Sequence, residues 1–442
     1  MFPAVQGQKP PSFFLLPHYA CAQGRSGSAV MSEPVTGPIV IVGAGQAGMQ
    51  LATTLRQLKC TAPITLIGDE PFPPYERPPL SKAYLAGELA EERLFFRKAQ
   101  AYADQGIDLR LATRVSVLDR ATRTVTTDRG ETLAYAACVL ATGSRARHLR
   151  IEGADLDGVL TLRGIADAKT LRNRVRPGLR AVVIGGGYIG MEIAASLTKL
   201  GARVTVVEAL PRVLSRGVAP AIATYVAQRH QDEGVVLQTG VGVAAFEGGA
   251  AVEGVRLADG RTLPADLVVV GVGAVMNDEL AAAAGLATDG GVVTDAMART
   301  ADAAVFAIGD VSVQDHGFLG RRVRLESVQN AVDQAKAVAR TLMGQPTAMV
   351  EVPWFWTQQF DMMIQMVGVA EEGLEWVSRG DPTTGSFALY GLTDGVISAV
   401  QAVNSGSDYA LGRRLVRDRT SAKASVLADP ATDLKALLAK RA

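Results

Sequence analysis

Two glycine-rich turns, each preceded by an apolar β-branched run, constrain the fold of this 442-residue chain more than any other feature. They read PIVIVGAGQAG over residues 38–48 and LRAVVIGGGYIG over residues 179–190. In a GxGxxG turn the first glycine permits a tight strand-to-helix turn, the second lets backbone N–H groups approach a pyrophosphate, and the third lets helix and strand pack closely. The sequence therefore predicts two dinucleotide sites, at Gly43, Gly45, Ala47 and Gly48 and at Gly185, Gly187, Tyr188, Ile189 and Gly190.

An acidic residue follows the second expected strand of each site. Asp69 comes after the run Ile64–Ile67, and Glu208 comes after Val204–Val207. A carboxylate in this place accepts hydrogen bonds from adenosine ribose hydroxyls, and Glu208 would repel the 2′-phosphate of NADP. We therefore expect NAD at the second site, although Arg212 and Arg216 lie close enough in sequence to accommodate a phosphate, and either acid could be a solvated loop residue.

The composition excludes several classes of protein. The chain has 45 basic and 44 acidic side chains, a net charge of +1 and no apolar run of about 18 residues, so we expect neither nucleic-acid nor membrane binding. Its three cysteines form no CxxC pair and cannot supply a four-cysteine iron–sulfur cluster, which favours a reducing, cytoplasmic setting. Residues 1–37 are rich in proline, glycine and serine, and we expect them to be a disordered or misassigned leader, since Met31 also suits a start.

The run YERPPLSK at residues 75–82 resembles the flavin segment of the NADH-dependent ferredoxin reductases that serve bacterial haem-thiolate monooxygenases and ring-hydroxylating dioxygenases. The wider fold of that family is that of glutathione reductase. The prolines predict a rigid extended segment that places Arg77 and Lys82 at the start of a helix. Glu192, two residues after Gly190, is expected in the first turn of the helix after the second glycine turn. The resemblance implies that Arg77 belongs to the flavin site, that Lys82 lies near flavin N5 and pairs with Glu192, and that these two are the catalytic residues. A cation near N5 would stabilise the charge of reduced flavin, whereas the bland alternative is a lysine at a solvated helix start.

Further segments carry the same resemblance: CVLATGSRAR (138–147), TADAAVFAIGDV (300–311), RLESVQNAVDQAKAVARTL (324–342) and PWFW (353–356). They imply a chain crossing beside the flavin nucleotide, a ribityl-binding aspartate, a helix N-terminus at flavin O2 and a tryptophan near the isoalloxazine. An arginine would reach the nucleotide from the adjoining domain, and a strand residue would contact the adenine. The residues concerned are Thr142 and Gly143 for the crossing, Asp310 for the ribityl chain, Val328 for the helix N-terminus, Trp356 for the isoalloxazine, Arg163 for the nucleotide and Val115 for the adenine. Trp356 could equally be plain core, and Val115 an ordinary strand valine.

The expected fold is therefore α/β, with two Rossmann-like dinucleotide-binding domains and a C-terminal α+β domain, as in glutathione reductase. We expect an FAD-binding domain over residues 38–145 and 272–347, an NAD-binding domain over 146–271 and a C-terminal reductase domain over 348–442.

The resemblance implies hydride transfer from NADH to FAD N5, followed by single-electron transfer to a separate 2Fe-2S ferredoxin, in a monomer or weak dimer. No cysteine lies near Lys82, which argues against thiol chemistry. A rubredoxin or monodehydroascorbate reductase would differ only in its acceptor, and a flavoprotein resembling apoptosis-inducing factor would instead sense NADH. A late helix carries Arg413, Arg414, Arg417 and Arg419, either as a solvated face or for docking an acidic ferredoxin.

Overall fold

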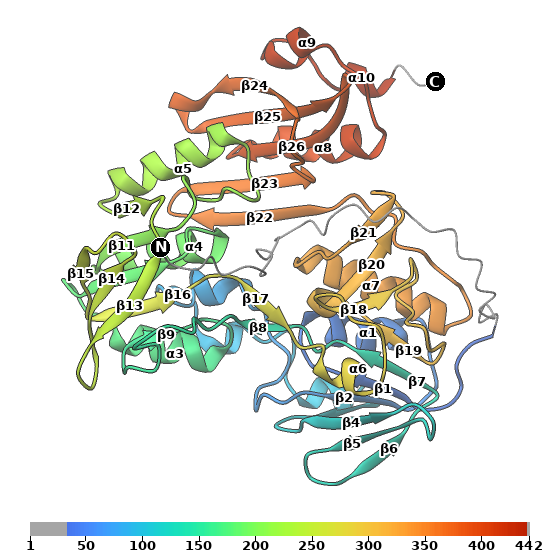
Figure 1. Ribbon diagram of the computed structural model, residues 1–442. Helices are drawn as coiled ribbons and strands as arrows, with labels where there is room; N and C mark the ends of the chain where they lie inside the picture. Colours follow the sequence, from blue (N-terminus) through green and yellow to red (C-terminus); the bar gives the residue numbers. More distant parts are fainter. Residues whose placement is uncertain (1–32, 440–442) are drawn as a thin grey trace, which may run out of the picture.

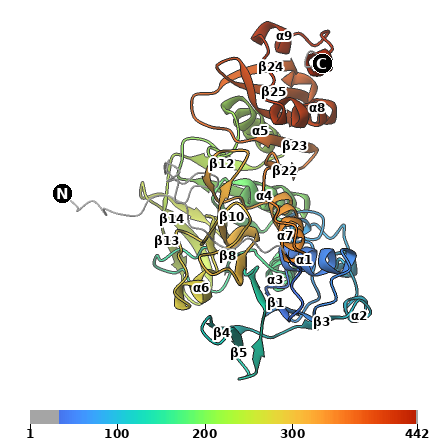
Figure 2. The same ribbon diagram turned by 90° about the vertical axis from the view of Figure 1, so that its right-hand side faces the viewer.

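The computed structural model describes residues 33–439, which form three packed units (Figure 1, Figure 2). Of the leader expected over residues 1–37, residues 1–32 lie outside the described residues. Of its remaining residues, Pro34 pairs with Met343 in an isolated bridge.

The first unit is built on a parallel sheet with the strand order β19-β7-β1-β2-β3. On β1, Ile39 and Ile41 pack with two helices, whereas Val40 and Val42 belong to a cluster shared with a small antiparallel sheet. Both faces are covered, which explains why this strand is a continuous apolar run. The elements are β1 (Ile39–Val42), β2 (Ile64–Ile67), β3 (Ile107–Arg110), β7 (Ala137–Leu140), β19 (Val305–Ala307), helices α1 (Gln46–Gln57) and α7 (Val328–Leu342), and the small sheet of β4 (Val115–Asp119), β5 (Thr124–Thr127) and β6 (Thr132–Ala134).

The second unit repeats this arrangement with a parallel sheet of order β12-β11-β10-β16-β9. Ala181 and Val183 of its central strand pack with helices, and Val182 and Ile184 pack with a second small antiparallel sheet. The elements are β9 (Val159–Leu160), β10 (Arg180–Ile184), β11 (Arg203–Glu208), β12 (Val236–Thr239), β16 (Leu267–Val270), helices α3 (Ile165–Arg174), α4 (Tyr188–Lys199) and α5 (Pro220–Asp232), and the small sheet of β13 (Val243–Gly248), β14 (Val252–Leu257) and β15 (Thr262–Pro264).

The chain leaves the first unit through β8 (Ser144–Ala146) and returns through β17 (Ala274–Met276), which pair antiparallel between the two parallel sheets (Figure 1). Each glycine turn follows the central strand of its parallel sheet, β1 or β10. From this strand the chain continues to neighbouring strands on opposite sides of it. Open α/β sheets bind ligands in the crevice at such a switch point. The smaller elements of the first unit are α2 (Gln100–Ala103), α6 (Glu279–Ala283), β18 (Val292–Thr294), β20 (Ser312–His316) and β21 (Arg321–Val323).

The C-terminal unit is an antiparallel sheet with the order β22-β23-β26-β25-β24, covered by helix α8. Its other face shares one hydrophobic cluster with α4 and α5 of the second unit, through Met362, Ile364 and Phe387 against Ile222 and Val226. Figure 1 shows β22 running beside α4 as a result. The elements are β22 (Trp354–Gln359), β23 (Met362–Gly368), β24 (Glu375–Asp381), β25 (Ser386–Thr393), β26 (Val396–Val403), α8 (Gly406–Arg417), α9 (Ala424–Ala428) and α10 (Ala436–Ala439).

Three local expectations from the sequence are wrong. The helix expected at Lys82 is a single 3-10 turn, η1 (Pro78–Ser81), followed by turns, because Lys82, with φ −124° and ψ −120°, leaves the helical region and ends it. Glu192 lies in the second turn of α4 rather than in its first. Arg419 lies beyond the end of α8 and has a positive φ of 47°, so it does not share the helical face of Arg413 and Arg414.

Candidate functional site

A cavity of about 510 Å³ lies where the three units meet, and its size suits a cofactor. It collects most of the residues singled out in the sequence. Those that line it are Gly43, Gly45, Ala47, Asp69, Arg77, Lys82, Thr142, Gly143, Arg163, Tyr188, Ile189, Glu192, Asp310, Val328 and Trp356. Those that do not are Gly48, Val115, Gly185, Gly187, Gly190 and Glu208.

The first glycine turn leaves space that the protein itself does not use. A Cβ on Gly43, whose φ is 114°, would meet the carbonyl oxygen of Ala141, and one on Gly48 would meet the carbonyl oxygen of Gly43. Gly45 has an ordinary φ of −83°, and a Cβ there would meet nothing within 4 Å. The chain's own packing thus requires the outer two glycines, while the middle one keeps the cavity wall open beside the N-terminus of α1. This is the arrangement that the diphosphate of a bound dinucleotide needs.

The second glycine turn shows the same division. A Cβ on Gly185 or Gly190 would meet the carbonyl oxygens of Gly271 or Gly185, but one on Gly187 would meet nothing within 4 Å. At the tip of β11, Glu208 accepts hydrogen bonds from the backbone N–H groups of Gly186 (2.7 Å) and Leu210 (2.8 Å). The carboxylate therefore lies against the glycine turn, where the residues fit a second dinucleotide, NAD(H).

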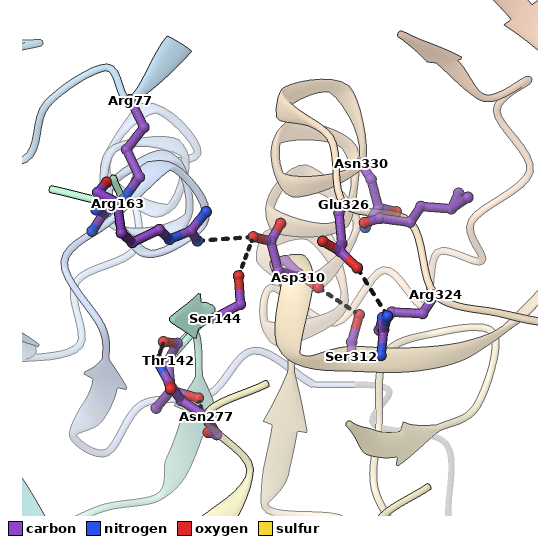
Figure 3. A network of polar contacts seen from close by, with 12 residues as sticks. Arg77, Thr142, Ser144, Arg163, Asn277, Asp310, Ser312, Arg324, Glu326 and Asn330 are labelled. Carbon is purple, nitrogen blue, oxygen red and sulfur yellow. Dashed lines mark hydrogen bonds and ion pairs between the residues drawn. The ribbon is translucent and has the colours of Figure 1, made fainter. Parts of the chain in front are cut away.

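Asp310 lies at the centre of a polar network on the cavity wall (Figure 3). Ser144 Oγ and Arg163 Nη2 each lie 3.0 Å from Asp310 Oδ2. Arg77 Nη1 donates to the backbone oxygen of Arg163 at 2.8 Å, and its Nη2 pairs with Glu70 at 2.5 Å. The network fixes the Asp310 carboxylate and draws together residues from both parallel-sheet units.

The two crossing segments are tied to each other below this network. Thr142 Oγ1 donates to the backbone oxygen of Asn277 at 2.6 Å, and Asn277 Nδ2 donates to the backbone oxygen of Thr142 at 2.9 Å. The backbone N–H of Asn277 also donates to Gly143, whose φ of 64° favours glycine. Figure 3 shows Thr142 and Asn277 together.

Helix α7 begins at the cavity. Its N-cap, Ser327, accepts a hydrogen bond from Asn330 N at 3.1 Å, and Val328 is its first residue. Glu326 also lines the cavity and pairs with Arg324 at 2.9 Å. Burial, followed by the nearby charge of Asp310, raises the pKa of Glu326 to about 7.

The expected ion pair between Lys82 and Glu192 is present, with 2.7 Å between Nζ and Oε2. Ser81 Oγ donates to the same oxygen at 2.5 Å, and Thr357 Oγ1 of β22 donates to Oε1 at 2.6 Å. The Glu192 side chain is only 4% exposed. Residues from all three units therefore converge on one buried carboxylate at the cavity wall.

Aromatic side chains close the cavity on the side of the C-terminal unit. Trp356 lines the cavity, and its ring centroid lies 5.7 Å from that of Trp354. The Arg413 guanidinium of α8 lies over the Trp354 ring at 5.3 Å. A chain of aromatic groups thus joins the cavity to the exposed arginines of α8.

The sequence did not single out three side chains of the site: Ser144, Asn277 and Thr357. Ser144 directly follows Gly143, and Thr357 directly follows Trp356. The motifs therefore place both residues near the site but assign neither of them a contact. Asn277 gives no local signal because only the pairing of β8 with β17 brings it to the site. Val115 is buried in the cluster beneath the first sheet and does not line the cavity.

Comparison with known proteins identifies the family. Residues 37–335 match the family model described as pyridine nucleotide-disulphide oxidoreductase, and residues 354–438 match the reductase C-terminal model. The chain is 43% identical over 409 residues to the ferredoxin–NAD(+) reductase component of the anthranilate 1,2-dioxygenase system of Burkholderia cepacia, covering 91% of this chain and 99% of the relative. It is 37% identical over 407 residues to putidaredoxin reductase of Pseudomonas putida, with coverages of 91% and 96%.

Solved structures agree. The ferredoxin reductase for the CYP199A2 system from Rhodopseudomonas palustris superimposes with a TM-score of 0.88 at 41% identity, covering 90% of this chain and 99% of that one. Putidaredoxin reductase in its covalent complex with putidaredoxin gives a TM-score of 0.88 at 36% identity, with coverages of 91% and 98%.

The fold and site define an oxidoreductase that uses FAD and NAD(H). The chain belongs to the pyridine nucleotide-disulphide oxidoreductase family, with the C-terminal domain of the ferredoxin reductases. This confirms the resemblance, fold class and cofactors expected from the sequence. Within residues 33–439, no helix is long and apolar enough to cross a membrane, and no cluster of three or more histidine, cysteine or acidic side chains is placed to hold a metal ion.

Proposed function

We propose that this protein is an FAD-dependent NADH:ferredoxin reductase that supplies electrons to a haem-thiolate monooxygenase or ring-hydroxylating dioxygenase through a separate 2Fe-2S ferredoxin. When bound, FAD accepts a hydride and releases electrons one at a time, which links NADH to a one-electron carrier. The observation that carries the proposal is the Lys82–Glu192 pair at the cavity wall, where residues of all three units hold the buried Glu192 carboxylate.

The residues have separate roles in this proposal. Lys82 supplies a fixed positive charge at the cavity wall, and Glu192 orients that charge and the nicotinamide carboxamide beside it. Asp310, held by Ser144 and Arg163, binds the ribityl chain. The N-terminus of α7, at Val328, directs backbone N–H groups into the cavity.

The remaining assigned residues bind the ends of the cofactors or lie against the ring. For FAD these are Gly43, Gly45, Ala47, Gly48, Asp69, Arg77, Thr142, Gly143 and Trp356, together with Val115, whose proposed contact with the adenine is made by its backbone alone because its side chain is buried outside the cavity. For NAD(H) they are Gly185, Gly187, Tyr188, Ile189, Gly190 and Glu208.

NADH rather than NADPH is the proposed donor. Two backbone N–H groups hold the Glu208 carboxylate against the second glycine turn, so a 2′-phosphate would meet a fixed negative charge. We also propose that residues 38–145 and 272–347 bind FAD, that 146–271 bind NAD(H), that 348–442 form the reductase domain, and that the protein acts in the cytoplasm as a monomer or weak dimer.

The first experiment is NADH-driven cytochrome c reduction by the purified flavoprotein, with and without a 2Fe-2S ferredoxin, and with NADPH as the alternative donor. Strong ferredoxin dependence is expected. Fast flavin reduction with no effect of ferredoxin would overturn the proposed acceptor and favour rubredoxin or another partner.

A pair of variants tests the site. Lys82→Ala and Glu192→Ala should slow flavin reduction by NADH while FAD stays bound. The matched control is Lys169→Ala, which breaks an exposed ion pair of the same 2.7 Å length, with Glu91, outside the cavity. Wild-type flavin reduction rates in both cavity variants would refute the assigned role of the pair.

A further inference from the structure

Strand β22 presents one face to the second unit, and the side chains on that face make a continuous series of contacts. The Phe355 ring lies 4.8 Å from the Tyr188 ring on α4, measured between centroids. Thr357 reaches Glu192, one turn further along α4. Gln359 reaches His230 on α5. Because alternate residues of a strand point the same way, a single strand of the C-terminal unit contacts three sites on the NAD(H) side.

The polar part of this series forms a chain of hydrogen bonds that ends on Glu192. His230 Nε2 lies 2.9 Å from Gln359 Oε1, Gln359 Nε2 donates to Thr357 Oγ1 at 3.1 Å, and Thr357 Oγ1 donates to Glu192 Oε1 at 2.6 Å. Since Gln359 directs its amide N–H at Thr357, its oxygen faces His230, which then donates from Nε2. Every donor in the chain therefore points toward the Glu192 carboxylate.

All four residues of this hydrogen-bonded series are buried. Thr357 and His230 are 0% exposed, Gln359 is 1% exposed and Glu192 is 4% exposed. Water cannot easily replace a lost donor at such depth, so each bond restricts its partner strongly. Burial also lowers the pKa of His230 to about 4, which keeps the ring neutral at neutral pH and suits a single N–H donor. A histidine that served only to pack the core would need no series of hydrogen bonds leading to a carboxylate at the cavity wall.

The two oxygens of Glu192 have different partners. Lys82 and Ser81 both contact Oε2, while Oε1 receives its hydrogen bond from Thr357. Removing the Thr357 hydroxyl would leave the carboxylate held at one oxygen only, free to rotate about its last bond. The orientation of the pair therefore depends on a residue that the C-terminal unit supplies.

We propose that Thr357, backed by Gln359 and His230, is a positioning residue for flavin reduction by NADH, and that it acts by fixing the Glu192 carboxylate against Lys82. This inference rests on the proposed function, because it assumes that the pair serves the reaction with NADH. It gives the C-terminal unit a part in the first half-reaction as well as in the contact with the electron acceptor.

Two variants of similar size test it. Thr357→Val removes the hydroxyl, and Thr357→Ser keeps it. In anaerobic stopped-flow measurements, Thr357→Val should lower the limiting rate of flavin reduction at saturating NADH about tenfold or more, with a larger isotope effect from 4-deuterated NADH, while Thr357→Ser stays near wild type. Calorimetric affinity for NAD⁺ and electron transfer from the chemically reduced enzyme to ferredoxin should be unchanged in both.

A second measurement does not depend on activity. In thermal unfolding of the FAD-loaded protein, the Tm shifts of Thr357→Val and Glu192→Ala should be non-additive, because the first variant removes the donor and the second removes the acceptor of the same hydrogen bond. A second pair, His230→Leu against His230→Gln, repeats the comparison at the far end of the chain, since the glutamine amide can still donate.

The outcomes separate the two proposals. A Thr357→Val enzyme that is reduced by NADH as fast as wild type, or additive Tm shifts, would overturn the positioning role. A wild-type enzyme that NADH reduces rapidly but that ferredoxin does not reoxidise would instead overturn the proposed function and leave the positioning role standing.

Discussion

At the scale of single residues, the two glycine turns separate what the fold requires from what a ligand requires. Gly48 and Gly190 are needed because a Cβ would run into backbone oxygens of their own turns. Gly45 and Gly187 have ordinary backbone angles and open space beside them. The folding of the chain therefore does not require glycine at these two positions, and the open space beside them is what the proposed close approach of a diphosphate needs.

This difference gives a paired prediction. Gly45→Ala should fold with an unchanged or slightly raised apoprotein Tm, since alanine at an accessible φ stabilises by about 0.4–1 kcal/mol, yet it should lose FAD during purification. Gly48→Ala should lower the apoprotein Tm because its Cβ meets the carbonyl oxygen of Gly43. The ratio of FAD to protein and the Tm of the apoprotein are the measurements. Full FAD content in Gly45→Ala would contradict the proposed diphosphate contact.

Glu326 gives a prediction for pH. Burial raises its pKa in the folded protein from 4.5 to about 7, so the folded state binds this proton more tightly than the unfolded state does. The resulting stabilisation is fully present below pH 4.5 and is lost as the pH rises to about 7. The Tm of Glu326→Gln should therefore rise relative to that of the wild type as the pH increases from about 5 to about 8. The exposed Glu253→Gln is the control, and a Tm difference that stays constant with pH would contradict the shift.

At the scale of elements, the sequence predicted the strands and helices best where one periodicity dominated. The continuous apolar runs of β1 and β10 are enough to locate these strands. In a sheet that is covered on both faces, apolar and polar residues do not alternate along a strand. The segment after Tyr75 predicts the start of a helix, but it forms only η1, since the backbone angles of Lys82 lie outside the helical region. Motif residues were found from sequence alone, whereas Thr357 became visible only through its contact with another unit and Asn277 only through the pairing of β8 with β17.

Helix α7 depends on its cap, and this can be tested directly. Ser327 satisfies Asn330 N at the helix start, so Ser327→Ala should lower the stability by about 1 kcal/mol, measured by denaturant unfolding. Ser327→Thr keeps the acceptor oxygen and should retain most of that stability. Because the same turn lines the cavity, Ser327→Ala should also weaken FAD binding. Equal stability of the alanine and threonine variants would show that the cap contributes nothing.

At the scale of the whole molecule, the units serve one cavity from different directions. The first supplies the turn at Gly45 and the carboxylate of Asp310, the second supplies Glu192, and the third supplies Trp356 and Thr357. The sequence locates all of these residues except Thr357 along the chain, but their convergence depends on how β22 packs against α4. Trp354 and Trp356 then connect the cavity with α8, whose Arg413 and Arg414 are exposed.

This geometry makes α8 the expected place for an acidic ferredoxin to dock. Charges at the rim of an interface act mainly on the rate of encounter, and salt weakens their effect. Arg413→Glu should slow ferredoxin reduction about fivefold at low salt and reduce its salt dependence, while flavin reduction by NADH stays unchanged because Arg413 does not line the cavity. Arg203→Glu, an equal charge change on β11 of the second unit, controls for net charge. If both variants slow ferredoxin reduction equally, the effect belongs to the overall charge of the protein, and the arginines of α8 form only a solvated face.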